Sequence, residues 1–486
     1  MPRSSSTASA DLGLLSPAWA GTPVADETGD LAVLRAMLDA EVALAAAQAK
    51  VGLISDAAAQ LIRDVAGTVE IDIADVARRS RSGGNPVIPL LADLRTAVAA
   101  ADAGAADSGA ADAGAAGYVH LGATSQDILD TALMLVARRG IRVVADDLDT
   151  AIAELVTLAN THRGTVMAAR TLTQHSVPTT FGVKAAGWLV GLVDAARGLR
   201  IAADALPAQL GGAAGTLASF TELAPGREFG IVEAFAAGLE LRPPVLPWHT
   251  HREPVTRIGD ALATVADALG KIAADVALMS RTEIAEVHEA TSGGSSAMPQ
   301  KQNPVLSVLL QAVARRAPGL AAELHRSALA VDERPDGAWH TEWQVLRELL
   351  RQVGGGASLA AELLPGLRVD ADRLQANLGI TGPLVVSERI ALVAGPLIGR
   401  DVVKELVAEA ARNQAAKNQA ARNQAAKNPA ANDPAANNPI SLFDLLKAAL
   451  PDWDDDRLRE LLDPGRYLGA NDAIVDRAIA HAKEIP

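Results

Sequence analysis

The sequence predicts an all-α protein, and three observations support that fold class. Aromatic residues make up only 3% of the 486 residues, and the apolar 49% consists mostly of Ala, Leu and Val, which favour close-packed helices over sheets. A chain of this length exceeds one hydrophobic core and should divide into two or three regions. Seven apolar residues with spacings alternating between four and three also form a seam typical of a long bundle helix: Ile258, Leu262, Val265, Leu269, Ile272, Val276 and Met279.

Other helices have recognisable ends. Residues 31–51 carry apolar side chains on one helical face, and Gly52 follows at the position of a left-handed cap. Ser55 is a typical N-cap for the next helix. Helical patterning returns in residues 440–450 and 470–482. The seam around residue 265 leaves open whether its helix packs across subunits or within a monomer.

Two low-complexity segments separate the predicted regions. Residues 99–117 are almost entirely Ala, Gly, Asp and Ser, and we expect a flexible insertion there. Residues 410–439 are six alanine-led pentads; the first copies are able to extend a helix, but the prolines of the later copies stop it. The predicted domains are therefore 1–117, 118–365 and 366–486, with the pentads as an insertion without a catalytic role.

Composition and charge argue against several functions. The absence of cysteine excludes disulfides and thiolate chemistry and fits a reducing cytoplasm. A net charge of −14 without a basic block makes nucleic acid or an anionic membrane an improbable partner. Apolar runs end well before 18 residues, so no membrane span is expected. Residues 1–21 imitate an export signal, but Asp11 and Pro17 interrupt the apolar run, and we expect a cytoplasmic protein.

The segment 291–304, TSGGSSAMPQKQNP, is suited to wrapping an anion. Gly293 and Gly294 allow close approach of the backbone to a ligand, while Lys301 and Asn303 offer donors at a spacing of two. A solvated Gly/Ser linker has a similar composition, and composition alone leaves that reading open.

A second candidate anion site is HLGATSQDILDTA, His120 to Ala132. Thr124 and Ser125 follow a glycine and precede a helix, where hydroxyl and N–H donors favour a carboxylate. A plain N-cap, with Ser125 capping and Asp127 in the first turn, explains the same residues equally well.

The order of these residues resembles the fumarase/aspartase superfamily, which includes argininosuccinate and adenylosuccinate lyases and bacterial carboxymuconate lactonizing enzymes. GSSAMPQKQNP matches the family loop GSSxMPxKxNP, and HLGATSQD is similar to its first block. ARTLTQHSVPTTFG is similar to the block GRTHxQxAxPxTFG, but Leu172 replaces the histidine that the lyases use in proton transfer. Gln174 and His175, like the segment ERPDGAWHTEW that begins at Glu333, are most similar to the lactonizing branch.

The resemblance implies an all-α, three-region subunit with a long central helical bundle. It further implies a homotetramer in which three subunits contribute to each active site. The implied reaction is the closure of 3-carboxy-cis,cis-muconate, a tricarboxylate, to a lactone in protocatechuate breakdown by the β-ketoadipate route. No cofactor and no metal are expected; His249 and His251 alone support a metal site only weakly.

The resemblance also assigns roles to residues of this chain. Ser295 aligns with the acid/base serine of the family, Lys301 polarises a carboxylate, and His175 is the candidate proton donor. The predicted substrate-binding residues are His120, Thr124, Ser125, Arg170, Gln174, Ser296, Asn303 and Arg334.

Two other functions remain open. One is a lyase of the same superfamily, such as adenylosuccinate lyase, against which Leu172 counts. The other is a structural homologue without catalysis, against which the complete loop counts. His251 and Glu253 stand where the family pattern has Gln and Asp, and the sequence does not say how they affect substrate choice. The Trp and His residues gathered near residues 248 and 340 predict either a lined cavity or helix packing.

Overall fold

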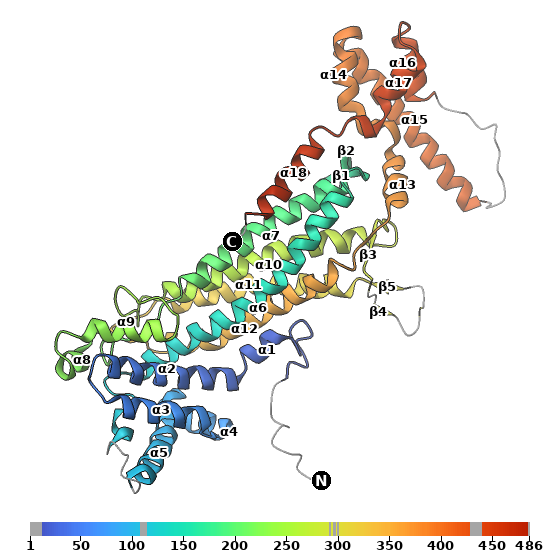
Figure 1. Cartoon of the computed structure of the whole chain (residues 1–486). Helices are drawn as coiled ribbons and strands as arrows, with labels where there is room; N and C mark the ends of the chain where they lie inside the picture. The colour runs from blue at the N-terminus through green and yellow to red at the C-terminus, as the bar shows by residue number, and fades with distance from the viewer. Residues whose placement is uncertain are drawn as a thin grey trace. The chain divides into compact units, whose positions relative to one another are not determined.

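The computed structural model of the chain describes residues 12–106, 114–290, 293–294, 298, 301–427 and 440–484. Helices dominate them, which confirms the all-α prediction (Figure 1). The α-helices are α1 Pro23–Glu27, α2 Asp30–Lys50, α3 Asp56–Thr68, α4 Ile73–Gly83, α5 Val87–Ala106, α6 Ser125–Thr161, α7 Phe181–Asp204, α8 Ala218–Leu223, α9 Glu228–Gly238, α10 Glu253–Met279, α11 Val305–Ser327, α12 Ala338–Leu363, α13 Ala371–Thr381, α14 Ser387–Ile398, α15 Arg400–Lys427, α16 Leu442–Ala449, α17 Asp455–Leu462 and α18 Asn471–Ala482.

Short 3₁₀ turns and strands complete the described structure. The 3₁₀ turns are η2 Ala115–Tyr118, η3 Gly382–Val386 and η4 Pro464–Arg466. The strands form three antiparallel pairs, β1 Val166–Thr171 with β2 Gln174–Thr180, β3 Val287–His288 with β6 Arg368–Val369, and β4 Gly293–Gly294 with β5 Gln302–Asn303.

The contacts group the chain into two compact units, each described by itself below. The first consists of Met1–Ala151, Leu192–Ala274 and Val305–Leu363, and the second of Ile152–Gly191, Asp275–Pro304 and Leu364–Pro486.

In the first unit, α10, α11 and α12 pack closely because small residues lie where the helices meet. A Cβ added to Gly270 of α10 would lie 2.4 Å from the Cβ of Ala314 on α11, and one added to Gly356 of α12 would lie 3.1 Å from Val313. The predicted seam of α10 is buried inside this single chain, from Ile258 at 0% exposed to Met279 at 1%. The seam therefore belongs to the core of the subunit, and it gives no evidence of its own for a tetramer.

The N-terminal helices follow their sequence signals with one exception. The Ser55 hydroxyl accepts a hydrogen bond from the Ala58 N–H at 3.0 Å and caps α3, as predicted, and Gly52 adopts a φ of +74° after α2. Residues 99–106 continue α5, so the flexible insertion predicted at 99–117 is wrong for this part. Alanine is the strongest helix former, and its abundance there outweighs the single glycine of this part.

In the second unit, the C-terminal helices surround an apolar cluster of their own. Its buried members include Val386, Ile390, Val403, Leu446 and Leu458. Helix α15 carries the first pentads in helical conformation as far as Lys427, as their composition allows. The remaining copies at 428–439 lie outside the described residues.

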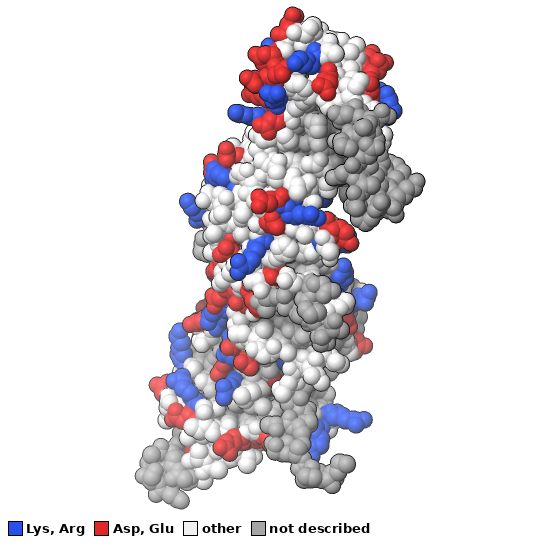
Figure 2. Space-filling model, turned by 90° about the vertical axis from the view of Figure 1, so that its right-hand side faces the viewer, with Lys and Arg blue, Asp and Glu red and all other residues white. Residues whose placement is uncertain are grey.

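Two surface features bear on partners. On the face drawn in Figure 2, acidic and basic side chains are interspersed rather than gathered into one basic area. Among the described residues, one stretch, Ala371–Ile398, is long and apolar enough to cross a membrane by length and composition alone. The 3₁₀ turn at Gly382–Val386 divides that stretch between α13 and α14.

Candidate active site

The start of α6 in the first unit brings together two predicted substrate residues that are 210 positions apart. The Arg334 guanidinium donates through Nη2 to the Thr124 hydroxyl at 2.8 Å and to the Ala213 carbonyl at 3.0 Å. Thr124 directly precedes α6, and Ser125 is its first residue. A cation, a hydroxyl and the positive end of a 37-residue helix thus meet at one place, which suits a carboxylate. We call Thr124, Asp127, the loop 211–215, His249 and Arg334 the α6 site.

The Asp127 carboxylate links the parts of the α6 site through four hydrogen bonds. Its Oδ1 accepts hydrogen bonds from the Gly211 N–H at 2.8 Å and from His249 Nε2 at 2.8 Å. Its Oδ2 accepts from the Gly212 N–H at 2.9 Å and from the Thr124 N–H at 3.0 Å. The carboxylate is 0% exposed. One buried side chain therefore fixes the helix start, the glycine loop and a histidine.

His120 lies close to this helix start but makes its own contact. Its Nδ1 is 2.7 Å from Oε1 of Glu41, which is only 1% exposed and comes from α2. A carboxylate on one ring nitrogen orients the ring and fixes its tautomer. His120 also adopts a φ of +64°, an uncommon conformation for a residue with a side chain. These features are compatible with the substrate-binding role predicted for His120, in which the oriented ring would help to position a carboxylate.

A buried ionic network lies one turn further along α6. The Arg252 guanidinium, 2% exposed, donates to Asp130 at 2.8 and 3.2 Å and to Glu342 at 2.6 to 3.2 Å. The Trp339 indole N–H donates to Asp130 at 2.8 Å. Burial favours the neutral form of Arg252, but the two carboxylates outweigh it and raise its pKa. Burial also raises the pKa of Glu342, more than Arg252 lowers it.

The Trp- and His-rich segment at the start of α12 is explained by this packing. Trp339 and Trp343 stack edge to face with ring centroids 4.8 Å apart, and His340 bonds to the Gly84 carbonyl at 2.9 Å. Of the two alternatives, helix packing is therefore the one that the structure favours over a lined cavity. Neither unusual residue of the segment before α10 joins the α6 site through a described contact: His251 is exposed, and Glu253 pairs with Arg257 at 2.5 Å.

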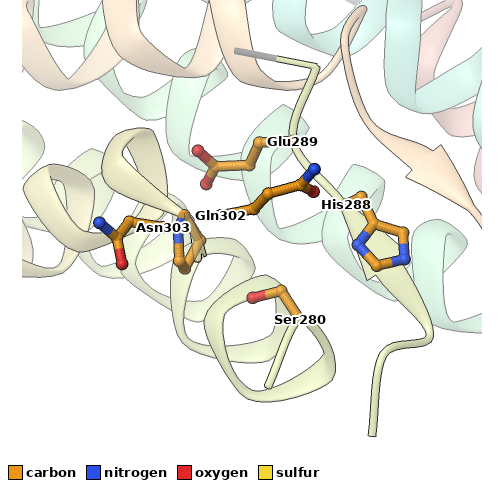
Figure 3. A pocket seen from close by; sticks show the side chains of 6 residues that line it. Ser280, His288, Glu289, Gln302 and Asn303 are labelled. Carbon is orange, nitrogen blue, oxygen red and sulfur yellow. The ribbon is translucent and has the colours of Figure 1, made fainter. Parts of the chain in front are cut away.

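The second unit contains an open cleft that includes Lys301 and Asn303. Its volume of about 460 Å³ lies within the range of small-molecule sites, and its wall includes Ser280, His288 and Gln302. In Figure 3 the side chain of Gln302 reaches toward His288, with the Ser280 hydroxyl nearby. Lys301 is exposed and forms no ion pair with any residue that the structure describes. Ser295 and Ser296 lie outside the described residues, so their predicted roles stay predictions.

Arg170, predicted to bind substrate, is engaged by a buried carboxylate instead. Its Nη1 and Nη2 donate to the two oxygens of Glu286 at 2.9 and 2.6 Å, and Glu286 is 0% exposed. Asn377 of α13 donates to the same carboxylate at 2.9 Å. This bidentate pair neutralises Arg170 and joins β1 to the turn before β3, which favours a structural role.

We predict that Arg170→Met lowers the free energy of unfolding by roughly 3 kcal/mol, because it leaves Glu286 buried without a counter-charge. The KM of the remaining folded enzyme should change less than about twofold. Arg163→Met is the matched control, since its pairs with Asp472 and Asp476 are exposed and contribute below about 1 kcal/mol. A stable variant with a large rise in KM would return Arg170 to substrate binding.

The β1–β2 hairpin carries His175, and its tip is strained. Leu172 and Thr173 form a two-residue turn with φ values of +47° and +71°, and Leu172 is 96% exposed. Gln174 is exposed, and its side-chain amide donates a hydrogen bond to the neighbouring Thr173 hydroxyl at 3.3 Å. His175 Nδ1 is 2.9 Å from the Thr381 hydroxyl. Burial, and then the nearby Arg170 charge, lower the pKa of His175, so the neutral ring is favoured near pH 7.

Sequence reasoning missed the partners of the predicted residues. Glu41, Glu286 and Thr381 lie far along the chain from the histidines and arginine that they contact, and no local motif marks them. Asp127 was visible as a first-turn acid, but its link to His249 required the fold. Asp127 and Asp130, three positions apart on one face of α6, are the local hint of the two networks.

Comparisons with known proteins assign the family. A lyase family model matches residues 23–319. The chain is 47% identical to nitrosuccinate lyase of Streptomyces davaonensis, covering 96% of this chain and 94% of that protein. It is 36% identical to 3-carboxy-cis,cis-muconate cycloisomerase of Bradyrhizobium diazoefficiens, covering 96% and 97%. The crystal structure of 3-carboxy-cis,cis-muconate lactonizing enzyme from Pseudomonas putida superposes with a TM-score of 0.85 at 31% identity, covering 97% and 99%.

The matching residues include the blocks at the start of α6 and along the β1–β2 hairpin, and the matches extend over nearly the whole chain. The chain therefore belongs to the fumarase/aspartase superfamily of lyases.

Proposed function

We propose that this protein eliminates nitrous acid from nitrosuccinate, leaving fumarate and nitrite. The observation that carries the proposal is the 47% identity to nitrosuccinate lyase over 96% of the chain, against 36% to the cycloisomerase over the same share. The predicted closure of carboxymuconate thus becomes the second candidate. Both reactions fit the superfamily, because lactone formation is chemically the reverse of a β-elimination.

The proposed step moves one proton and one electron pair. A base removes a proton from C3 of nitrosuccinate, and the neighbouring carboxylate takes up the developing charge. The C2–C3 double bond then forms as the C2–N bond breaks, and nitrite leaves with the bonding pair. We assign the base to Ser295 and the stabilisation of the charged carboxylate to Lys301 and Asn303. The α6 site binds the other carboxylate.

The leaving group accounts for the absence of the lyase histidine. Nitrite is a stable anion near pH 7 and leaves without being protonated, whereas an amine must accept a proton as it departs. Leu172 occupies the position of the histidine in the lyase pattern, and the lowered pKa of His175 keeps that ring mostly neutral near pH 7. Neither side chain needs to act as a general acid in the elimination of nitrite.

The number of available cations also fits a four-carbon dicarboxylate. Of the three cations predicted to meet carboxylates, Arg170 is held by Glu286, while Lys301 and Arg334 remain. Two cations match the two carboxylates of nitrosuccinate. We propose further that the blocks meet in a homotetramer, as the family resemblance implies, in a cytoplasmic enzyme that needs no cofactor.

Carboxymuconate closure is favoured by a different observation, the TM-score of 0.85 to the lactonizing enzyme over 97% of the chain. In that reaction His175 would deliver the proton to the carbon next to the new C–O bond. The two functions are separated by incubating the purified protein, without added cofactor, with each substrate. Nitrite release together with fumarate absorbance supports the first function, and loss of the carboxymuconate diene absorbance supports the second. No turnover of either substrate would contradict both.

We predict that His175→Gln lowers kcat for nitrosuccinate less than about tenfold, because no general acid is required. If the cycloisomerase function holds instead, the loss of kcat should reach about two orders of magnitude or more.

The same His175→Gln variant also tests the lowered pKa of His175 through the stability of the fold. Because the folded-state pKa of His175 is lowered, its contribution to stability is present above its ordinary pKa of about 6.5 and is lost as pH falls below it. Unfolding midpoints across that window should depend on pH less in the variant than in the wild type.

A further inference from the structure

The imidazole of His249 is buried beside the α6 site with one of its two nitrogens unused. The residue is 3% exposed, and Nε2 is 2.8 Å from Asp127 Oδ1. Within the part of the chain that the structure describes, Nδ1 has no hydrogen-bond partner. Buried polar atoms in folded proteins are nearly always hydrogen-bonded, so this nitrogen points to a ligand.

The contacts of Asp127 determine which nitrogen carries the proton. Three backbone N–H groups and His249 Nε2 occupy the four acceptor positions of the carboxylate. Since backbone N–H groups can only donate, the carboxylate carries no proton of its own, and Nε2 must donate as well. The tautomer is therefore fixed with the proton on Nε2, and Nδ1 faces its surroundings either as an acceptor or, in the protonated ring, as a second donor.

The unused nitrogen faces the same loop that supports Arg334. A Cβ added to Gly215 would lie 3.6 Å from His249 Nδ1, and one added to Gly211 would lie 3.0 Å from the ring carbon Cε1. Between these glycines, the Ala213 carbonyl accepts the hydrogen bond from Arg334 Nη2. Glycines thus keep side chains away from the Nδ1 edge of the ring, next to the residues that are suited to bind a carboxylate.

The charges around the α6 site include one carboxylate that lacks a counter-charge of its own. Asp127 contributes one negative charge directly behind the helix start, and a protonated His249 would neutralise it, so that Arg334 stays the one net positive charge of the α6 site and Lys301 the second cation for substrate. The network behind His249, in which Arg252 faces Asp130 and Glu342, adds no positive charge. With a neutral His249, a substrate carboxylate would meet a site of no net positive charge.

We propose that His249 becomes protonated when substrate binds and donates its Nδ1–H to the substrate carboxylate held at the α6 site. Asp127 stabilises the imidazolium from the opposite nitrogen, in the way that a carboxylate supports a histidine in other proton-transfer sites. The inference deepens the proposed function, since it names the group that recognises one carboxylate of a dicarboxylate.

The test uses succinate, a dicarboxylate without a leaving group, so that binding is measured independently of turnover. We expect titration calorimetry at pH 7.5, in Hepes and in Tris, to show uptake of up to about one proton per site, because the proposed imidazolium forms only when the carboxylate binds. This measurement on the wild-type protein tests the protonation of His249 without any variant. Binding without proton uptake, or no binding of succinate, would overturn the inference.

A substitution of His249 distinguishes the role of its Nδ1 from that of its Nε2. Gln places its amide near the position of Nε2, so His249→Gln keeps a donor to Asp127 and loses Nδ1. We expect a nearly unchanged unfolding midpoint, a Kd for succinate at least about tenfold higher, and no proton uptake. His325→Gln is the control, because His325 also pairs with an aspartate, Asp260 at 2.9 Å, but is exposed on α11.

The outcomes remain distinguishable from those of the proposed function. The wild-type enzyme could bind succinate with proton uptake and yet not process nitrosuccinate. That result would support the role of His249 and contradict the proposal that nitrosuccinate is the substrate. Wild-type affinity and proton uptake in His249→Gln would reject the role of His249 and leave nitrosuccinate elimination intact.

Discussion

Ser295→Ala should lower kcat for nitrosuccinate by about two to four orders of magnitude, while KM changes little. The family resemblance makes Ser295 the base that removes the C3 proton, and loss of a positioned base costs rate in this range. Its carboxylate-binding partners remain in the variant, so substrate should still bind. Stopped-flow or steady-state nitrite release, with unfolding midpoints to exclude misfolding, is the appropriate measurement.

Ser280 provides the sharpest competitor to that assignment. It lines the cleft with Lys301 and Asn303, and its hydroxyl donates only to the Ala277 carbonyl, at 3.3 Å, among the described contacts. Ser280→Ala should therefore lower kcat less than about tenfold. If Ser280→Ala lowers kcat as much as Ser295→Ala or more, Ser280 rather than Ser295 would be assigned as the base.

Arg252→Met should lower the free energy of unfolding by about 3–5 kcal/mol. Methionine matches the length of the arginine stem but leaves Asp130 and Glu342 buried without their shared counter-charge. The loss should shrink as pH falls. Burial raises the pKa of Glu342, so its carboxyl group binds a proton more tightly in the folded state than in the unfolded state. The free energy of unfolding therefore falls as pH rises from about 4.5 through the raised pKa of Glu342.

The control for this prediction is Arg257→Met on the same helix. Arg257 pairs with Glu253 one turn earlier on α10, and both side chains are exposed, so this change should cost below about 1 kcal/mol. Chemical unfolding followed by circular dichroism compares the two variants. Equal stability of Arg252→Met and Arg257→Met would show that the buried network contributes nothing to the fold.

Local signals in the sequence predicted much of this fold. Composition predicted helices, the apolar seam predicted α10, and Ser55 predicted the start of α3, because caps and periodicity depend on neighbouring residues alone. The same reasoning failed at residues 99–106, where the helix propensity of alanine outweighs a low-complexity pattern. The role of the seam also needed the fold, since a repeat of apolar residues does not reveal which helices cover it.

The candidate site was predictable only in part. Motif order identified Thr124, Lys301 and Arg334, and the structure brings Arg334 onto Thr124. The pairing of Arg170 with Glu286 and of His249 with Asp127 links residues more than 100 positions apart, which no periodicity marks. The pairing of Arg170 with Glu286 removes one of the three cations predicted to meet carboxylates, and this supports the proposal of a dicarboxylate substrate.

The most direct test of nitrosuccinate elimination is a side-by-side comparison of kcat/KM for nitrosuccinate and 3-carboxy-cis,cis-muconate with one preparation of the enzyme. We predict that nitrite and fumarate appear in equal amounts, with a kcat/KM at least about 100-fold above that for carboxymuconate, because only nitrosuccinate matches the two available cations and needs no general acid. A kcat/KM that is higher for carboxymuconate, with lactone as the product, would contradict the proposed function.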